Sequence, residues 1–396
     1  MSKHFAFVIT PGHGHVNPTL PLVEELVARG HRVTYVTGAR LLPAVAPTGA
    51  NLLERPWDPS VLAPAANGEP FDPAKVITAI LRTQALLEQT YPAMVARFQQ
   101  DRPDAFCYDT LDTLGSQLAE KLEVPTVELI PSMASNEHFN LRSVLAPGGD
   151  PAAMRAVFAD VIEARAKFRA ANGLRTLDAA SLIMNPPASL NLVFVPREFQ
   201  IAGDTFDDSF RFLGPALGSR AGAGDWRPPA DGSPVLFVSL GTVLNNRPDF
   251  FAQCIEAFGD SSWHVVMAVG ETAALPPVPD NFEVAPYFPQ PLVLADAAVF
   301  ISHTGINSTM ESLYNGVPLV SVPQMPEQAL NGGRVEELGL GRRLDPETIT
   351  PQSLRQTVDE VANSPAIHAN VTKFGEQLRA VNAPALGADA LERLLG

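Results

Sequence analysis

The sequence HFAFVITPGHGHVNPTLPLVEELVARGHRVTYVT, residues 4–37, decides the fold class. An apolar run of strand length (4–10) leads into a glycine-containing loop, then into apolar residues at helical spacing that stop at a glycine, and then into a second strand (31–37). We expect Asn17 to cap the helix, with Pro18 in the first turn where its missing N–H costs nothing. A strand, a helix and a strand in this order open a parallel sheet with helices on its faces.

The same order returns in the second half of the chain. Residues 234–240 form an apolar run, 250–258 have helical periodicity, and 263–269 form another apolar run. A length of 396 residues also favours two domains, because single cores usually stop growing near ~250–300 residues. We therefore expect an N-terminal domain over residues 1–214, a linker rich in Pro, Gly and Ala over 215–233, a C-terminal domain over 234–380, and a last helix within 381–396 that the sequence assigns to neither domain.

Composition narrows the function classes. Lys and Arg total 28 and Asp and Glu total 43, so the net charge is −15, which is the wrong sign for binding a nucleic acid backbone. Only two cysteines occur, and the first ten residues have no signal-peptide pattern, so we expect a cytoplasmic protein. No apolar run reaches the ~20 residues of a membrane-spanning helix, so we expect no membrane association.

Two polar motifs follow strands of the first domain. The loop PGHGHVNP, with His13 and His15, follows the first strand, and Asp109 ends the apolar run 105–109. The carboxyl ends of parallel strands meet at the ligand crevice of an open sheet, where a histidine and an aspartate can act as a base and its orienting partner. The alternatives are a turn histidine and an aspartate that caps the next helix, and both remain open at this point.

A third motif in the second domain is longer and more specific. A strand (298–302) is followed by His303, by a turn with Gly305, and by a helix whose first turn contains Asn307, Ser308 and Thr309. A helix N-terminus with short polar side chains favours an anion such as a diphosphate. Ordinary capping by Asn307 or Ser308 explains one residue of this run but not the whole of it.

Several other sites are disfavoured by the residues. The first loop lacks the third glycine of a dinucleotide fingerprint, and the chain has neither a lysine-bearing P-loop nor a Gly-x-Ser-x-Gly elbow. Four further histidines have no ligand spacing, so we expect no metal site: His4, His31, His264 and His368.

These motifs together resemble the UDP-glycosyltransferases, family 1 of the glycosyltransferases, and in particular their bacterial macrolide and natural-product branch. The resemblance rests on the first loop, on SNEHF (135–139), on the ordered run from Tyr287 to Gln328, and on RVEELGLG (334–341), and it extends over the whole chain. It implies an α/β protein of the GT-B class, with two facing Rossmann-like domains, the N-terminal one for the acceptor and the C-terminal one for the nucleotide sugar.

The resemblance also implies roles for individual residues. His15 matches the general base and Asp109 its partner, with His13, two residues upstream, as the competing candidate. Tyr287 stands where the family usually has a tryptophan that stacks on the base, and Glu327 where the plant enzymes have aspartate. The implied donor-binding residues are Thr242, Tyr287, Phe288, Gln290, His303, Gly305, Asn307, Ser308, Thr309, Glu311, Glu327 and Gln328, and the acceptor-pocket candidates are Trp57, Phe71, Met133 and Phe139.

The sequence therefore predicts an inverting, metal-independent transfer of a hexose from UDP-glucose to a hydroxyl of an apolar acceptor such as a macrolide or flavonoid. The nucleotide sugar is a co-substrate and no cofactor is expected. The partners are these two small molecules, and we expect a monomer or a weak homodimer. Two alternatives remain: a nucleotide-sugar epimerase or hydrolase of the same fold, and a non-enzymatic protein that binds an apolar metabolite.

Overall fold

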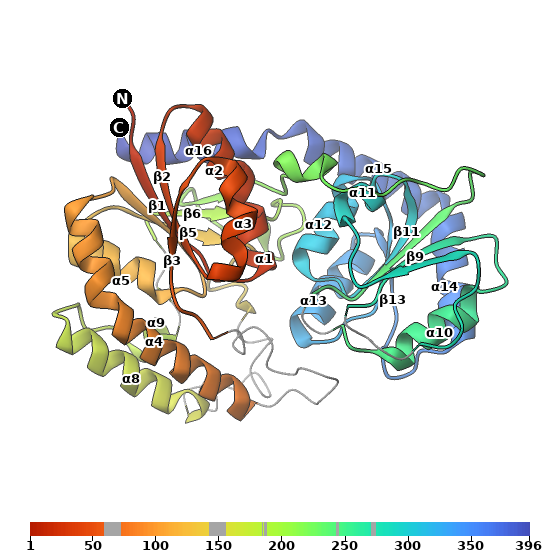
Figure 1. The fold of residues 1–396 in the computed structure, drawn as a ribbon, viewed down its shortest axis with the longest axis horizontal. Coiled ribbons are helices and arrows are strands. Elements are labelled where there is room, and N and C mark those ends of the chain that lie inside the picture. Colours follow the sequence, from red (N-terminus) through yellow and green to blue (C-terminus); the bar gives the residue numbers. More distant parts are fainter. Residues whose placement is uncertain (59–72, 142–155, 184, 186–187, 243–244, 271–274) are drawn as a thin grey trace. The chain divides into compact units, whose positions relative to one another are not determined.

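The computed structural model describes residues 1–58, 73–141, 156–183, 185, 188–242, 245–270 and 275–396. The chain divides into two compact units (Figure 1). Unit 1 comprises the described residues up to 216 together with 382–396, and unit 2 comprises those from 217 to 381. The division after residue 216 lies inside the segment 215–233 that the sequence analysis treats as a linker.

Unit 1 is built on a seven-stranded parallel sheet with the strand order β3-β2-β1-β4-β5-β6-β7. The order reverses between β1 and β4, which pair in register with Val8 opposite Tyr108. This is the topological switch point, at which open α/β sheets bind ligands. The strands are β1 (His4–Val8), β2 (Arg32–Thr37), β3 (Asn51–Glu54), β4 (Ala105–Asp109), β5 (Thr126–Ile130), β6 (Leu190–Val193) and β7 (Phe210–Phe212).

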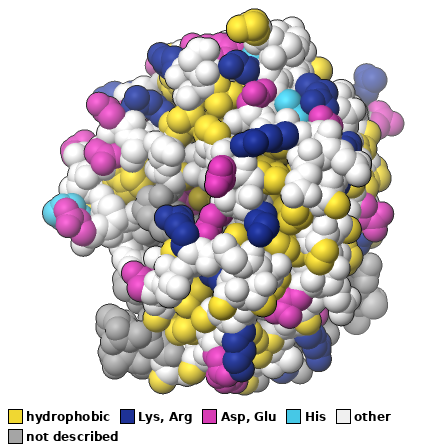
Figure 2. Space-filling model, turned by 90° about the vertical axis from the view of Figure 1, so that its left-hand side faces the viewer, with side chains coloured by type: hydrophobic (Ala, Val, Ile, Leu, Met, Phe, Trp, Pro, Cys, Tyr) yellow, Lys and Arg dark blue, Asp and Glu magenta, His cyan; other side chains and the backbone are white. Residues whose placement is uncertain are grey.

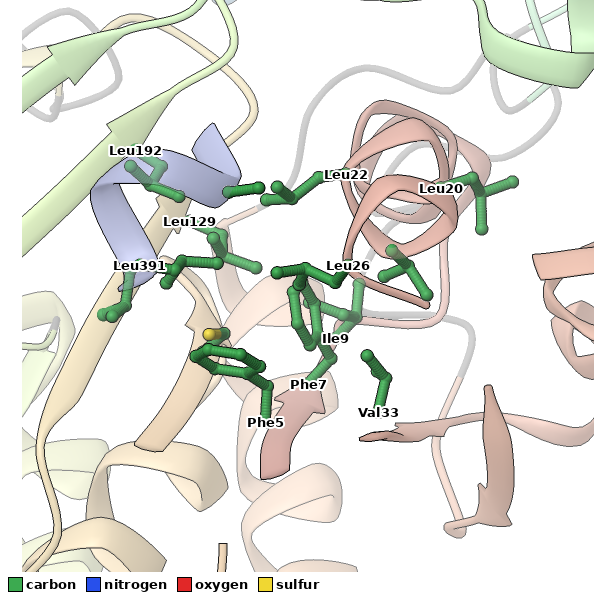
Figure 3. Close-up of a cluster of buried hydrophobic side chains, with 14 of the residues drawn as sticks. Phe5, Phe7, Ile9, Leu20, Leu22, Leu26, Val33, Leu129, Leu192 and Leu391 are labelled. Carbon is green, nitrogen blue, oxygen red and sulfur yellow. The ribbon is translucent and has the colours of Figure 1, made fainter. Parts of the chain in front are cut away.

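Helices cover both faces of this sheet because its central strands are apolar on both faces. Phe5 and Phe7 of β1 and Ile9 after it pack on one face in a cluster with α2 and α16 (Figure 3). Ala6 and Val8 pack on the other face with α4 and α5. The sequence analysis did not predict α4, the 28-residue helix that covers much of this second face. The helices of unit 1 are α1 (His13–Val16), α2 (Leu20–Ala28), α3 (Leu42–Val45), α4 (Pro73–Gln100), α5 (Thr113–Leu122), α8 (Ala159–Ala171), α9 (Ala179–Ile183) and α16 (Ala383–Leu395).

The last helix, α16, belongs to unit 1, although the preceding helix belongs to unit 2. Its Leu391 is fully buried in the cluster that contains Leu22 and Leu26 of α2 (Figure 3). Arg29, at the end of α2, donates to Asp389 at 2.6 Å and to Glu392 at 3.0 Å. Apolar packing and ion pairs therefore both attach α16 to unit 1. The sequence had not indicated on which domain this last helix packs.

Unit 2 has a six-stranded parallel sheet with the order β10-β9-β8-β11-β12-β13, whose switch point lies between β8 and β11. The two predicted α/β halves are thus confirmed. The strands are β8 (Val235–Ser239), β9 (His264–Ala268), β10 (Phe282–Ala285), β11 (Ala297–Ser302), β12 (Leu319–Ser321) and β13 (Gly341–Arg343), and the helices are α10 (Pro248–Phe258), α11 (Gln290–Leu294), α12 (Ile306–Tyr314), α13 (Pro326–Glu337), α14 (Pro351–Asn363) and α15 (Pro365–Ala380).

The surface is mixed in charge. On the face presented in Figure 2, Lys and Arg side chains are interspersed with Asp and Glu. Among the described residues, none of the helices combines the length and the apolar character that crossing a bilayer requires.

Candidate active site

The switch point of unit 1 brings His15 and Asp109 together. His15 lies in α1, directly after β1, and Asp109 is the last residue of β4. Their side chains meet with His15 Nδ1 2.6 Å from Asp109 Oδ2, although 94 residues separate them in sequence. The His15 side chain is 16% exposed, whereas that of Asp109 is 1% exposed. The arrangement is a partly open imidazole on a buried carboxylate.

The carboxylate of Asp109 is held by its other oxygen. Oδ1 accepts hydrogen bonds from the Thr10 hydroxyl at 2.8 Å and from the Leu111 backbone N–H at 2.9 Å. Because both oxygens have partners, the carboxylate cannot rotate without losing contacts, and it fixes the imidazole that it contacts. Val16, the neighbour of His15, is fully buried and anchors the short helix.

The structure separates the two histidines of the first loop. His13 is exposed, and the side chain that contacts Asp109 is that of His15. The predicted cap of this helix is wrong: helical structure begins at His13 after Gly12, and Asn17 lies within a helical stretch as the C-cap of α1. The loop turns into a helix earlier than the Asn-Pro pair indicated, and this early turn places His15 over the sheet edge.

A second buried carboxylate, Asp112, caps α5 by accepting a hydrogen bond from the Leu114 N–H at 2.8 Å. This resolves the capping alternative, because the cap is Asp112 and not Asp109. The partner of Asp112 is the guanidinium of Arg55, which follows β3 and is 4% exposed. Arg55 also lies over the ring of Trp57, with its Cζ 5.0 Å from the ring centroid.

The switch point of unit 2 places His303 against two glycines. A Cβ atom on Gly241 would lie 2.7 Å from ring atoms of His303, and one on Gly305 would clash with the Nε2 atom, so both positions require glycine for the ring to fit. Burial lowers the pKa of His303 to about 4, so the ring is neutral near pH 7. A neutral imidazole can donate one hydrogen bond to an anion but adds no positive charge.

Thr304, between His303 and Gly305, has a φ of 58°, which is unusual for a β-branched residue. Its hydroxyl is 2.8 Å from the Ser321 hydroxyl and donates to the Gln328 carbonyl at 2.9 Å, and Asn331 donates to its carbonyl at 3.0 Å. These bonds hold a strained turn in place. The geometry of the loop between β11 and α12 is therefore set by α13 and β12.

The N-terminus of α12 is capped by Gly305, which has no side chain to occupy the first-turn N–H groups. The capping alternative for Asn307 and Ser308 is thus wrong: both lie in the first turn itself. The Thr309 side chain is fully buried, and its hydroxyl already donates to the Gly305 carbonyl at 3.2 Å. Asn307, Ser308 and His303 remain as side-chain candidates for an anion, with Thr242, which is exposed after Gly241.

Three of the predicted nucleoside residues lie between β10 and α12, and the fourth, Glu311, lies within α12. Tyr287 is 68% exposed and Phe288 is half-buried. Gln290, the first residue of α11, donates to Glu311 Oε2 at 2.7 Å and to the Ser308 hydroxyl at 3.2 Å. The other oxygen of Glu311 accepts from Arg220 Nη2 at 2.7 Å. The buried carboxylate of Glu311 is thus oriented from both sides, by Gln290 and by Arg220.

The predicted sugar pair, Glu327 and Gln328, lies in the first turn of α13. The side-chain oxygen of Gln328 accepts a hydrogen bond from the Gln324 N–H at 2.7 Å, which leaves its amide NH₂ as the end available to a ligand. Arg247 donates to the side-chain oxygen of Gln324 at 2.5 Å and so supports the same turn.

The acceptor candidates are placed unevenly. Trp57 and Phe139 are half-buried in unit 1, whereas Met133 is buried at 2% exposure and contributes to the interior. Phe71 lies outside the described residues.

Sequence reasoning missed the arginines of the site, Arg55, Arg220 and Arg247. Arg55 directly follows the C-terminal end of β3. The sequence could have identified it in the same way as Asp109, as a polar residue at the carboxyl end of a parallel strand. Arg220 lies in a short 3₁₀ turn (Gly218–Gly222) in a segment without apolar periodicity, and its contact with Glu311 spans 91 residues.

Comparison with known proteins gives relatives over the full length. The family model described as "Erythromycin biosynthesis protein CIII-like, C-terminal domain" matches residues 253–394. The chain is 36% identical to the NDP-glycosyltransferase YjiC of Bacillus licheniformis, with 99% of this chain and 98% of that protein covered. It is 34% identical to the demethyllactenocin mycarosyltransferase of Streptomyces fradiae, with 99% and 86% covered. A solved structure, the glycotransferase of kitacinnamycin, matches with a TM-score of 0.85 at 34% identity over 100% of both chains.

Proposed function

Because the chain belongs to the UDP-glycosyltransferase family, in its bacterial natural-product branch, we propose that it transfers a hexose from UDP-glucose to a hydroxyl group of an apolar acceptor, with inversion at the anomeric carbon. The acceptor class that we propose is a macrolide, a flavonoid or a related polyketide or phenol. The enzyme is a glycosyltransferase of the GT-B class, and the donor, the stereochemistry and the acceptor are the proposal.

The observation that carries the mechanism is the contact of 2.6 Å between His15 Nδ1 and Asp109 Oδ2. The opposite ring nitrogen, Nε2, takes the proton of the acceptor hydroxyl as its oxygen forms a bond to the anomeric carbon, while the bond from that carbon to the diphosphate breaks on the opposite face. Asp109 stabilises the imidazolium that forms and keeps the ring in one orientation. The proton rests on His15 and the negative charge leaves with the nucleoside diphosphate.

The charge of the leaving diphosphate is stabilised by unit 2. The N-terminus of α12, with Asn307 and Ser308, supplies the helix dipole and donors, and neutral His303 and Thr242 add hydrogen bonds. These groups can fill the role that a divalent ion has in other phosphate-transfer sites, so transfer is expected to persist in EDTA.

A series of phenols of graded acidity tests the role of His15. His15→Ala should lower kcat by about 10²–10⁴ on an ordinary phenol, the usual effect of losing a positioned base. The loss should shrink on a nitrophenol, which is already ionised near neutral pH and needs no base. Asp109→Ala should show the same trend with a smaller loss, because it carries no proton. The measurement is kcat/KM at saturating donor across the series.

His13→Ala is the matched control, since it removes the neighbouring exposed histidine of the same loop. If the loss of kcat/KM in His15→Ala is the same for every phenol, His15 is not the base. If the loss in His13→Ala instead depends on phenol acidity, His13 is the base. Release of free hexose without acceptor glycosylation would favour a hydrolase instead.

A further inference from the structure

A second negative side chain lies on the same buried turn as Asp109. The Asp112 N–H donates to the Asp109 carbonyl at 2.8 Å, and both carboxylates are 1% exposed. Burial raises the pKa of Asp112, and the negative charge of Asp109 adds to that rise, while the Arg55 guanidinium opposes it. The charge state of Asp112 therefore depends on Arg55. Any net charge on the Arg55–Asp112 pair acts on the neighbouring His15–Asp109 dyad.

Arg55 is fixed in place by contacts at both ends. Its backbone N–H donates to the Thr37 carbonyl at 2.9 Å, which continues the pairing of β3 with β2. Its guanidinium lies over Trp57, and Nη2 donates to Asp112 Oδ2. The distance from residue 55 to residue 112 in sequence is 57, so only the sheet order brings the two together.

Other charged and titratable groups around the turn come from every element packed on it. On α8, Arg165 acts electrostatically on Asp112 while its guanidinium donates to the carbonyls of Leu182 and Ile183. On β2, burial raises the pKa of Tyr35 so that it stays neutral. Further groups are His15 on α1, Tyr108 on β4, whose pKa burial raises so that it stays neutral, and Glu128 on β5, which accepts from Thr110 at 2.8 Å. The neutral Thr10 hydroxyl donates to Asp109.

We propose that Arg55 and Asp112 are a positioning pair for the His15–Asp109 dyad: Arg55 cancels the charge of Asp112, so that the dyad operates beside a neutral pair and not beside a free charge. Neither residue contacts the substrate in this proposal. It rests on the proposed function in that His15 is the base, but its electrostatic content can be measured on the His15 ring itself.

Asp112→Asn is the deciding variant. Asparagine caps helices as well as aspartate does, so the start of α5 is kept and only the charge is removed. Arg55 is then uncancelled, and a cation near the imidazole disfavours its protonated form. The titration midpoint of His15 should fall by about one pH unit, the scale expected for one unscreened charge within a few side chains. The readout is NMR of labelled histidine, with the His15 signal identified as the one missing in His15→Ala.

Two further variants test the direction in which the His15 titration midpoint moves. Adding Arg55→Met to Asp112→Asn removes the free cation, so the midpoint should return to the wild-type value. Arg55→Met alone should move it upward by a smaller amount, because Asp112 then takes up a proton within the range of the titration. A downward shift in Arg55→Met, or an unchanged midpoint in Asp112→Asn, would overturn the proposal. Arg55→Met also decides the question if Asp112→Asn does not fold.

Glu120→Gln is the matched control. Glu120 lies two turns further along α5 and pairs with Arg169 at 2.6 Å, with side-chain exposures of 17% and 6%. This variant also leaves an arginine without its carboxylate in unit 1, but far from the dyad. We expect a lower melting temperature and an unmoved His15 midpoint. If Asp112→Asn behaves in the same way, the pair is merely structural and the proposal fails.

The pH profile of kcat/KM separates this inference from the proposed function. If His15 is the base, the acidic limb of the profile should follow the NMR midpoint in each variant. If the His15 titration midpoint shifts but the acidic limb of the kcat/KM profile does not, His15 is not the base. The electrostatic inference about Arg55 and Asp112 would still hold. A midpoint and a limb that both stay unmoved in Asp112→Asn would reject the inference alone.

Discussion

His15 and His303 are the same residue type in two electrostatic settings. His15 contacts the Asp109 carboxylate and is partly open to solvent. His303 is enclosed between Gly241 and Gly305, and burial lowers its pKa to about 4, so it stays neutral near pH 7. In the mechanism that we propose, His15 carries the proton of the acceptor, whereas neutral His303 can form hydrogen bonds but adds no positive charge.

Tyr287 is the residue for which exposure argues most directly for a ligand. Tyr287 is 68% exposed, so its ring contributes little to the packing of the free protein. Tyr287→Ala should weaken UDP binding by about 1–3 kcal/mol, the range for loss of stacking on a base, and leave acceptor binding unchanged. Calorimetry with UDP measures this. Val278→Ala, an exposed apolar change in the same unit, is the control and should have no effect. Equal affinity in the Tyr287 variant and the wild type would remove it from the nucleoside site.

Single glycines allow helices to approach neighbouring strands and loops closely. Gly115 of α5 lets this helix approach β4 so closely that a Cβ atom would meet the Cβ of Tyr108. Gly332 of α13 similarly leaves room for Ser321 and Thr304. In each unit, the helix that follows or supports a strand end is thereby held tightly to the edge that carries the site residues.

The attachment of α16 to unit 1 gives a prediction about stability. Leu391 is fully buried among α2 and sheet residues, so Leu391→Ala should lower the free energy of unfolding of unit 1 by about 2–4 kcal/mol, through lost burial and the cavity that remains. Arg393→Ala, on the exposed side of the same helix, should change it by less than about 0.5 kcal/mol. Urea unfolding of both variants tests this. A loss in Leu391→Ala as small as that in Arg393→Ala would mean that burial of Leu391 contributes little to the attachment of α16.

At the scale of the whole molecule, each unit places its candidate residues at the switch point of its own sheet. In unit 1 these are the ends of β1 and β4, and in unit 2 the ends of β8 and β11. Both sheets place polar side chains at the switch point, but the groups differ: a histidine that contacts a carboxylate in unit 1, and polar side chains with a neutral histidine at a helix N-terminus in unit 2.

The pH dependence of unfolding should differ between the units because of His303. Its pKa is lowered to about 4 in the folded chain against 6.5 ordinarily, so the unfolded chain binds the proton first. Stability from the neutral ring is complete above pH 6.5 and is lost as the pH falls toward 4, by about 2 kcal/mol between pH 7 and pH 5. His303→Gln should remove this slope from the unfolding transition of unit 2, as measured in urea at several pH values. His138→Gln, in unit 1, should leave it unchanged, and an unaltered slope in His303→Gln would contradict the assignment.

The local sequence determined the elements and the motifs that follow them. Apolar runs of strand length and helical periodicity predicted β1, β8, β9 and β11, because side-chain burial depends on spacing along the chain. The same rule placed His15 and Asp109 at strand ends, since the carboxyl ends of parallel strands share one edge. The long helix α4 was missed although its buried residues Leu87, Tyr91, Met94 and Phe98 recur at helical spacing, so the signal for this helix was present in the sequence.

Only the tertiary structure decided the pairings of charge. Arg55 with Asp112, Arg220 with Glu311, and α16 with α2 join residues separated by 57, 91 and more than 350 positions, respectively. No periodicity connects such residues, because the strand order and the close approach of helices at glycines bring them together. The neutrality of His303 likewise depends on burial between two loops. The sequence by itself therefore determined the fold class and the chemical groups of this protein, and the packing of distant segments decided which of those groups are paired, charged or open.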